Sequence, residues 1–547
     1  MNRKFIDILF AILVFSLPFK YIPNVLWQNF LGGPFGQDLV VYPLLIGFIY
    51  TTYCQWKYKN VVYKWDIFKK FIFVYLAILL ISLAWGLFIY PYYGQILNGP
   101  ADQIEKLPKV LAFLQGVGIP IAEKTLLKLW MFARPVKGVF FEVLYTFGAA
   151  YMIFCWYHDR VQRAIDILLK VTTVDLVIIA AYGLVDVCYQ NGQMWAQNTL
   201  MVLNPFIHAN VTITPRPGET VTMMFCDSQN RSVFLEPSYF GIFMAFTYPL
   251  LWLNIFFTRN HYKKTGLWIL YVIITFEIFL SQSRLALAVN LGIFFLLGII
   301  CLYRVQKKLV VFFITLLFSG GLAFIGAMAF LQHGQIPSGL GDRYPLATKW
   351  EEMQKIHETG KGLKNIDADD YFKEGLVSLS AAHETRKHVG SNHSRFTIQK
   401  THIQLGLEHP LIGVGTSLRQ GYLRDKLDKD SGDEIQTWNK VIDSKGLLAG
   451  GFANLGDFTL RLAETGIFGL SLYLFPAFIL ILSFGKALIR RKTDIAKVAQ
   501  ILFIALSFVG MMATGLGDGI NITFCYWVDM AVGYLILHEK NRLSLSI

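Results

Sequence analysis

Charged residues are scarce in this sequence. They make up 16% of the 547 residues, against roughly 25% in ordinary soluble domains. Hydrophobic residues make up 54%, aromatic residues 15%, and the mean hydropathy is +0.46. A soluble fold cannot bury this much apolar surface, whereas a lipid bilayer accommodates it. The composition therefore excludes an ordinary soluble enzyme and predicts an integral membrane protein.

The chain also lacks the short motifs of several common enzyme classes. It has no Walker phosphate-binding loop, no G-x-S-x-G and no H-E-x-x-H, the signatures of nucleotide hydrolases, serine hydrolases and zinc proteases. It contains no acidic cluster typical of a metal site, and none of its six cysteines forms a C-x-x-C. We therefore expect no metal ion and no cofactor.

The cysteines leave a disulfide open, and the net charge does not indicate a nucleic-acid partner. Cys188 and Cys226 both fall on the outer side in the membrane map below. In an oxidising compartment they can form a disulfide, and two free thiols are the alternative. The formal charge is +13, but the basic residues are spread between apolar runs rather than gathered in a patch. We therefore expect no nucleic-acid partner.

Twelve apolar runs come close to the ~20 residues that a membrane-spanning helix needs. The first begins with basic residues, as a signal peptide does, but no small-x-small cleavage site follows it, so we expect it to be a span. The runs lie at about 5–19, 39–55, 71–90, 137–157, 164–188, 234–257, 266–281, 284–302, 309–331, 458–485, 497–514 and 522–538. The predicted fold class is an all-α polytopic membrane protein.

Basic residues distinguish the two sides of this map. With a cytoplasmic N-terminus, the inner segments carry 22 lysines and arginines, whereas the short outer segments 20–38 and 515–521 carry one, Lys20. Lysine and arginine in short loops favour the cytoplasmic side. The asymmetry predicts that both termini are cytoplasmic.

The map divides the chain into three parts. Residues 1–331 form a membrane domain of nine spans, with outer loops near 91–136 and 189–233. Residues 332–457 form a large, mostly helical outer loop, and 458–547 hold the last three spans. In the first outer loop, two amphipathic stretches, near Gln103–Gln115 and Ile119–Phe132, are too polar to span. We expect them to lie at the membrane surface, with a re-entrant hairpin as the alternative.

Polar residues at the outer ends of the spans are the candidates for chemistry. Residues 231–240 read RSVFLEPSYF, where the proline suits a first helical turn and Glu236 is either a cap or a functional carboxylate. Residues 281–284 read SQSR; Arg284 either reaches the headgroups or binds a lipid-linked phosphate. Residues 461–466 read RLAETG, where Arg461 and Glu464 either pair with each other or serve a site.

Residues 394–415 read SRFTIQKTHIQLGLEHPLIGVG and predict one helix followed by a turn. Polar residues recur at helical spacing along one side of this helix. They are Arg395, Gln399 and His402, followed by Gly406. The apolar residues Phe396, Ile403 and Leu407 form the other side, which we expect to be the buried stripe. Arg231, Arg284, Arg395 and Arg461 thus lie near one membrane face, and guanidinium groups suit phosphate oxygens.

These segments resemble the O-antigen polymerase and O-antigen ligase superfamily of bacterial envelope enzymes. The matching pieces are FLEPSYFG at 234–241, SQSRLA at 281–286, RFTIQKTHIQLGLEHPLIGVGTS at 395–417 and LAETGIFGLSLYL at 462–474. Arg395 and Gly406 fit the R-x10-G spacing associated with the polymerases. The predicted topology, with a large outer loop before the tenth span, agrees with the resemblance.

The resemblance implies transfer of a glycan from undecaprenyl pyrophosphate to a sugar hydroxyl, at the periplasmic face of the bacterial inner membrane. The pyrophosphate is a good leaving group, so the reaction implies neither nucleotide nor metal. The residues expected to bind the pyrophosphate or the glycan are Arg231, Arg284, Arg395, Gln399 and Arg461. The expected catalytic residues are Arg284 and Arg395, with His402, Glu236 or Glu464 as the base. The bilayer, the lipid-linked oligosaccharide and a chain-length regulator are the candidate partners.

One position departs from the ligases, which carry a His-Asn pair about nine residues before the glutamate of their E-x-G motif. Here 454–456 read Asn-Leu-Gly, without the histidine, which favours a polymerase of repeat units. A ligase that transfers glycan to lipid A-core or protein is the alternative. A lipid-linked oligosaccharide flippase is the third reading. The long outer loop, the few charges within the spans and the lack of repeat symmetry argue against it.

Overall fold

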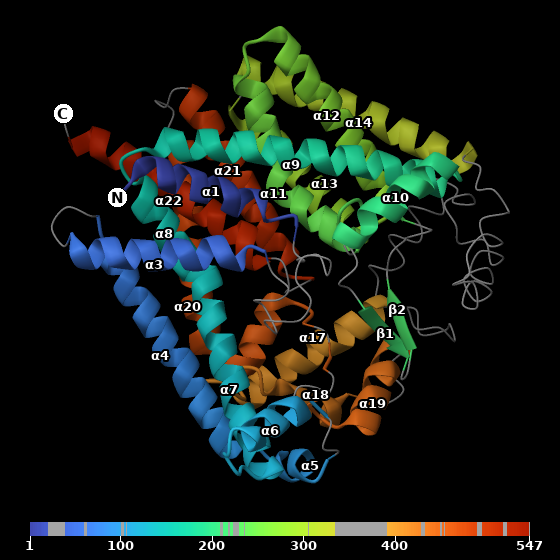
Figure 1. The fold of residues 1–547 in the computed structure, drawn as a ribbon. Helices are drawn as coiled ribbons and strands as arrows, with labels where there is room; N and C mark the ends of the chain where they lie inside the picture. The colour runs from blue at the N-terminus through green and yellow to red at the C-terminus, as the bar shows by residue number, and fades with distance from the viewer. Residues whose placement is uncertain are drawn as a thin grey trace.

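The computed structural model of this chain is built almost wholly of helices (Figure 1). Among the residues that the structure describes, eight helices are long and apolar enough to cross a membrane, as a polytopic all-α protein requires. The structure describes residues 1–19, 39–58, 63–99, 103–104, 107–207, 212–216, 219–222, 229–234, 236–304, 306–333, 391–427, 433–448, 451–452, 454–489, 495–517 and 522–545.

The eight candidate spans correspond to eight of the twelve apolar runs. One of them is continuous through α7, a π-helical turn η1 and α8, over Glu123–Tyr157. The elements are α4 (Asp66–Ile89), α7 (Glu123–Val143), η1 (Leu144–Gly148), α8 (Ala149–Tyr157), α11 (Pro237–Phe257), α12 (His261–Ser281), α13 (Arg284–Arg304), α14 (Lys307–His333), α20 (Asp457–Ile489) and α21 (Ile495–Thr514).

The other four predicted spans are helices that do not meet the same test of length and apolarity. They are α1 (Arg3–Phe15), α3 (Val41–Lys57), α9 (Val161–Gln190) and α22 (Ile522–Leu545). At about 1.5 Å per residue, the 13 residues of α1 reach about 20 Å, less than the ~30 Å of a bilayer core. The count of twelve spans stays a prediction.

Shorter elements gather at the end of the molecule opposite the termini and along its lower side (Figure 1). They are α5 (Tyr93–Leu97), α6 (Leu107–Gly116), α10 (Met194–Ile207), α17 (Ser391–Glu408), α18 (Arg419–Lys426), α19 (Asp433–Lys445) and the antiparallel strands β1 (Thr212–Arg216) and β2 (Glu219–Thr222). The second predicted amphipathic stretch is not a separate surface helix, because most of it forms the start of the long helix that ends at Tyr157. Residues 334–390 of the large loop lie outside the described part.

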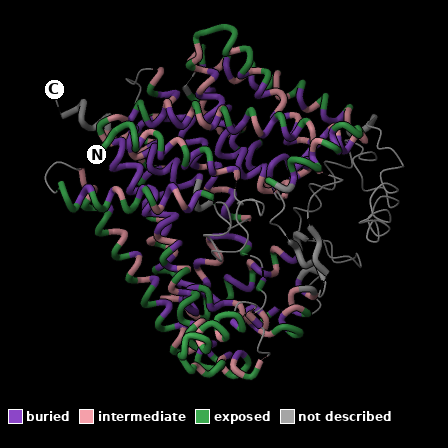
Figure 2. The backbone as a smooth tube through the Cα atoms, in the orientation of Figure 1, coloured by how far each residue is buried: buried purple, intermediate pink, exposed green. Residues whose placement is uncertain are grey.

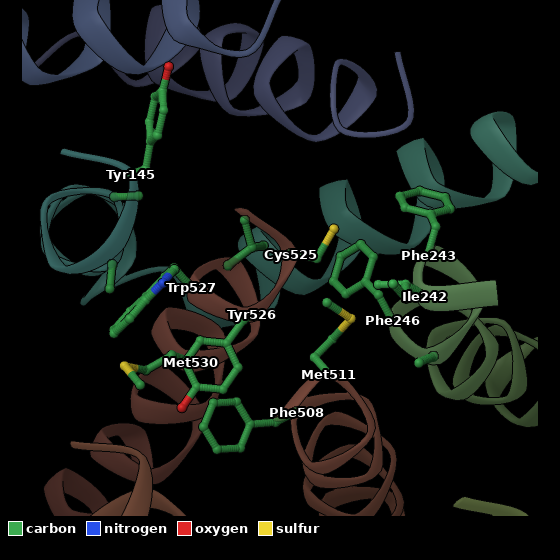
Figure 3. Close-up of a cluster of buried hydrophobic side chains, with 14 of the residues drawn as sticks. Tyr145, Ile242, Phe243, Phe246, Phe508, Met511, Cys525, Tyr526, Trp527 and Met530 are labelled. Carbon is green, nitrogen blue, oxygen red and sulfur yellow. The ribbon is translucent and has the colours of Figure 1, made fainter. Parts of the chain in front are cut away.

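The core lies where the apolar helices α9, α11, α21 and α22 pack together, and the buried residues concentrate there (Figure 2). Aromatic rings fill much of it (Figure 3). Phe508 of α21 stacks on Tyr526 of α22 with ring centroids 4.7 Å apart. Trp527 packs edge-on against Phe147 of η1 at 4.5 Å. This rigid block anchors the helices whose ends carry the candidate site residues.

A close crossing of α11 and α13 brings two of the sequence motifs together. A Cβ added to Gly241 would lie 1.8 Å from the Cβ of Ala286, so only glycine fits at this point. The Asn290 side chain of α13 donates to the Gly241 carbonyl over 3.4 Å. The last residue of one motif, Gly241, therefore packs directly on the last residue of the other, Ala286, and Arg284 is the first residue of α13.

Candidate functional site

The helix α17 buries one side within the protein and leaves its apolar stripe on the outer surface. Phe396, Ile403 and Leu407 were the expected buried stripe, but they are 49%, 42% and 72% exposed. His402 is fully buried, and a Cβ added to Gly406 would lie 2.5 Å from Leu462 of α20. The apolar stripe faces outward, as in an amphipathic helix on a membrane surface, and the opposite side of α17, which includes Ile398, Leu405 and His402, is buried.

The helix α20 is interrupted at Gly466, which has φ +64° and ψ −167°. In a regular helix the amides of residues 467 and 468 would bond the carbonyls of residues 463 and 464. Here those amides donate to the carbonyls of Pro410 and Leu411, over 2.8 and 3.3 Å. The freed carbonyls of Ala463 and Glu464 accept from the amides of Val414 and Gly415, over 2.9 and 3.0 Å. The turn after α17 therefore replaces four helical bonding partners, so that these backbone groups stay hydrogen-bonded at the break.

Arg419, at the start of α18, joins three segments beside this break. Its Nη1 donates to Glu464 Oε1 over 2.9 Å, its Nε donates to His402 Nε2 over 3.2 Å, and its Nη2 donates to Asn454 Oδ1. Arg419 is almost fully buried, so these charge-assisted bonds are shielded from water. We call Arg419, His402, Asn454 and Glu464 the Arg419 cluster.

His402 is held neutral inside this cluster. Burial and the neighbouring positive charge of Arg419 lower the pKa of His402 from 6.5 to about 3. A guanidinium group only donates hydrogen bonds, so Nε2 must be the acceptor and the ring proton sits on Nδ1. Within the described part of the chain, Nδ1 has no hydrogen-bond partner. The candidate base His402 thus has its basic nitrogen occupied by Arg419.

Arg461 belongs to a different, closed cluster. Its Nε bonds Asp457 Oδ2 over 3.2 Å, its Nη1 donates to Tyr75 Oη over 3.0 Å and pairs with Glu142. Its guanidinium carbon lies 3.7 Å from the Tyr473 ring centroid. The expected alternative of a pair with Glu464 is not formed, because Glu464 pairs with Arg419. These contacts point to a structural role for Arg461.

Arg231 and Glu236 lie on the segment that leads into α11. Arg231 is buried, and its amide donates to Asp186 Oδ2 over 3.3 Å. The amide of the preceding Asn230 donates to the Leu280 carbonyl over 3.1 Å, which places this segment beside the end of α12. Glu236 occupies the N-cap position without a capping bond from its side chain, and Ser238 Oγ donates to its Oε2 over 3.3 Å. The simple capping role does not account for this carboxylate.

Arg284 and Arg395 differ from the other two arginines. Arg284 is exposed and Arg395 is half-buried, and neither has an ion pair or hydrogen bond among the described residues. The turn at residues 515–517 touches both of their helices. Gln399, one turn after Arg395, donates to the Leu516 carbonyl over 3.1 Å, and a Cβ on Gly517 would lie 3.1 Å from Leu285. The turn therefore contacts α17 one helical turn after Arg395 and α13 next to Arg284.

The structure brings together most of the residues chosen from sequence, but one was missed. Gln399, His402 and Glu464 lie where α17 meets α20 and the turn at 515–517. Arg395 lies one helical turn before Gln399, Arg284 lies beside Leu285, which faces the same turn, and Arg461 belongs to the separate cluster on α20. Arg419 was not chosen, because it follows a glycine turn and belongs to no periodic pattern. The one available signal was its position as the first charged residue after that turn. The predicted pairing of Cys188 with Cys226 stays untested, since Cys226 lies outside the described residues.

Comparison with known proteins gives one match. A family model described as O-antigen ligase matches residues 269–474, which confirms the resemblance to the O-antigen polymerase and ligase superfamily. The matched segment includes Arg284, α17, the Arg419 cluster and the break in α20. No curated protein and no solved structure matches the chain.

Proposed function

We propose that this chain, part of which matches the O-antigen ligase family, is a membrane glycosyltransferase that polymerises oligosaccharide repeat units. Its donor is an oligosaccharide on undecaprenyl pyrophosphate, and its product is a surface polysaccharide such as an O-antigen. The site faces the periplasm and both termini lie in the cytoplasm of a bacterial cell. The charge asymmetry of the loops supports this orientation, and the termini lie at the same end of the molecule (Figure 1).

The pair Arg284 and Arg395 is the observation that carries this proposal. A buried arginine that is already paired has no charge to offer a ligand, which applies to Arg461 and Arg419. Arg284 and Arg395 keep their donors free among the described residues, and they lie on the two helices that the turn at 515–517 contacts. Two guanidinium groups at such a spot suit the two phosphates of a lipid-linked pyrophosphate.

The chemistry follows from that placement. The acceptor hydroxyl attacks the anomeric carbon of the donor glycan, and the bond from that carbon to the pyrophosphate oxygen breaks. Negative charge grows on the leaving pyrophosphate, and fixed cations stabilise it by about 3–4 kcal/mol for each key donor. The reaction calls for no nucleotide and no metal. A chain-length regulator is the protein partner that this activity would engage.

A reconstituted assay tests the proposal. Purified protein in liposomes is given undecaprenyl-pyrophosphate-linked repeat units, without nucleotide or added metal, and the products are separated on a gel. We expect a ladder whose steps are one repeat unit. Substrate that only crosses the bilayer, with no new glycosidic bond, would mean that the chain is a transporter.

A ligase is the second candidate, because the matching family is described by that activity. The same assay distinguishes it when lipid A-core is added. A ligase moves the glycan onto lipid A-core and yields no ladder in its absence. The chain has Asn454 but no histidine before it, which favours the polymerase.

A further inference from the structure

The Arg419 cluster includes His402 of α17, the helix that also carries Arg395. Arg419 donates to His402, Asn454 and Glu464, which come from α17, the segment before α20, and α20 itself. The Ser82 hydroxyl of α4 also donates to the Glu464 carbonyl, over 2.7 Å. Glu464 is therefore fixed at both its backbone and its side chain.

Of the candidate bases, His402 is unsuited to take a proton from a substrate. Its Nε2 accepts from Arg419, and its Nδ1 carries the ring proton. The whole side chain is 0% exposed, so an acceptor sugar cannot reach either nitrogen. A general base must come within about 2.6–3.2 Å of the proton that it takes.

Glu464 meets the requirements that His402 fails. The ion pair uses only its Oε1, and the backbone amide of Ser417 also donates to this carboxylate. Its side chain is 11% exposed, against 5% for Arg419. A carboxylate oxygen that the ion pair leaves available can act as a proton acceptor.

We propose that Arg419 is the positioning residue of this site, which fixes Glu464 through Oε1 and occupies Nε2 of His402, so that Glu464 accepts the proton of the attacking sugar hydroxyl. This inference rests on the proposed function. The hydroxyl oxygen forms the new bond to the anomeric carbon of the donor, its proton passes to Glu464 Oε2, and the pyrophosphate leaves with the electron pair of the broken bond. The proton then passes from Glu464 to water.

Steady-state kinetics of variants in the liposome assay test this inference. Arg419→Lys keeps one positive charge but cannot hold three acceptors in a planar fork. We expect kcat to fall at least tenfold with KM for the lipid-linked donor changed less than threefold. Glu464→Gln should lose at least a hundredfold in kcat, and His402→Gln, which keeps an acceptor for Arg419, less than tenfold. Arg424→Ala, on the same helix but exposed and paired with Asp443, is the matched control and should retain wild-type rates.

A chemical rescue separates positioning from mere structural support. Added guanidinium ion should restore part of kcat to Arg419→Ala by refilling the vacated site. If that variant does not fold, as judged by gel filtration and thermal melting, Arg419→Lys carries the test. Full kcat in Arg419→Lys or in Glu464→Gln, with an active wild-type protein, would overturn the inference alone. A wild-type protein without any product would overturn the proposed function on which it rests.

Discussion

The amide of Ile467 in α20 donates to the carbonyl of Pro410, 57 residues earlier in the chain, over 2.8 Å. A membrane helix thus takes one of its backbone bonds from the turn that follows α17. The exchange is made at Gly466, where the helix is interrupted. In a bilayer an unsatisfied backbone group costs several kcal/mol, so the break depends on the turn that satisfies it.

Gly466→Ala should destabilise this junction. The residue has φ +64°, a conformation that costs a non-glycine residue about 1–3 kcal/mol, and the new Cβ would lie 2.4 Å from the Leu411 backbone. We expect a clear drop in melting temperature in detergent and loss of activity. Gly485→Ala in the same helix, where a Cβ meets nothing within 4 Å, is the control. Equal melting temperatures for the two variants would contradict the role given to the break.

Gly241→Ala should push α11 and α13 apart at their crossing and so destabilise the protein. The new methyl group would overlap the Cβ of Ala286 at 1.8 Å, and overpacking of this kind costs typically 1–3 kcal/mol or more. Gly292→Ala on α13, which faces open space, should be tolerated. Thermal melting of both variants checks this, and activity should fall only in Gly241→Ala, because Arg284 moves with its helix.

Arg461→Ala should act on stability. The substitution leaves Glu142 and Asp457 without their counter-charge in a buried cluster, and breaking a buried pair costs about 3–5 kcal/mol. The exposed pair of Arg424 and Asp443 should contribute little by comparison, about 0–1 kcal/mol. Denaturation of Arg461→Ala and Arg424→Ala in mixed micelles measures the difference. A stable Arg461→Ala that no longer binds donor would instead place Arg461 in the binding site.

Arg284→Ala and Arg395→Ala should act on the reaction. Neither side chain has a partner among the described residues, so we expect normal melting temperatures. Loss of one fixed cation should lower kcat by about 10²–10³. Lysine at either position should recover only part of the rate, because it cannot bind phosphate oxygens bidentately. Unchanged chain length and yield in both alanine variants would remove these residues from the site.

Acidification should destabilise the protein through His402. The pKa of His402 is about 3 in the folded protein against an ordinary value of 6.5, so between these values the unfolded chain binds the extra proton. Its stabilising contribution is complete above pH 6.5 and is lost as the pH falls toward 3, at up to about 1.4 kcal/mol per pH unit. Between pH 7 and pH 5, the melting temperature should fall more steeply with decreasing pH for the wild type than for His402→Gln. The same pH dependence of the melting temperature in both proteins would contradict the assignment of His402 as a neutral, buried residue.

Hydropathy predicted the helices well because apolar runs of this length usually form membrane-spanning helices. Eight runs meet the length and apolarity of a span, and α17 forms where its pattern indicated. The pattern of α17 shows which side is apolar, but it does not show what packs against the other side. Phe396 is exposed while His402 is buried, because Arg419 supplies a partner that lies 17 residues further on. Such a contact has no local signal in the sequence.

The π-helical turn Leu144–Gly148 sets the rotational phase between the two halves of one long helix. Before it, Glu142 points at Arg461 and Tyr75. After it, Trp156 points at Thr51, to which it donates over 2.8 Å. A π turn accommodates one extra residue, and one residue corresponds to about 100° of rotation in an α-helix. Deleting a single residue there would restore a regular helix and leave Glu142 and Trp156 unable to face their partners at the same time.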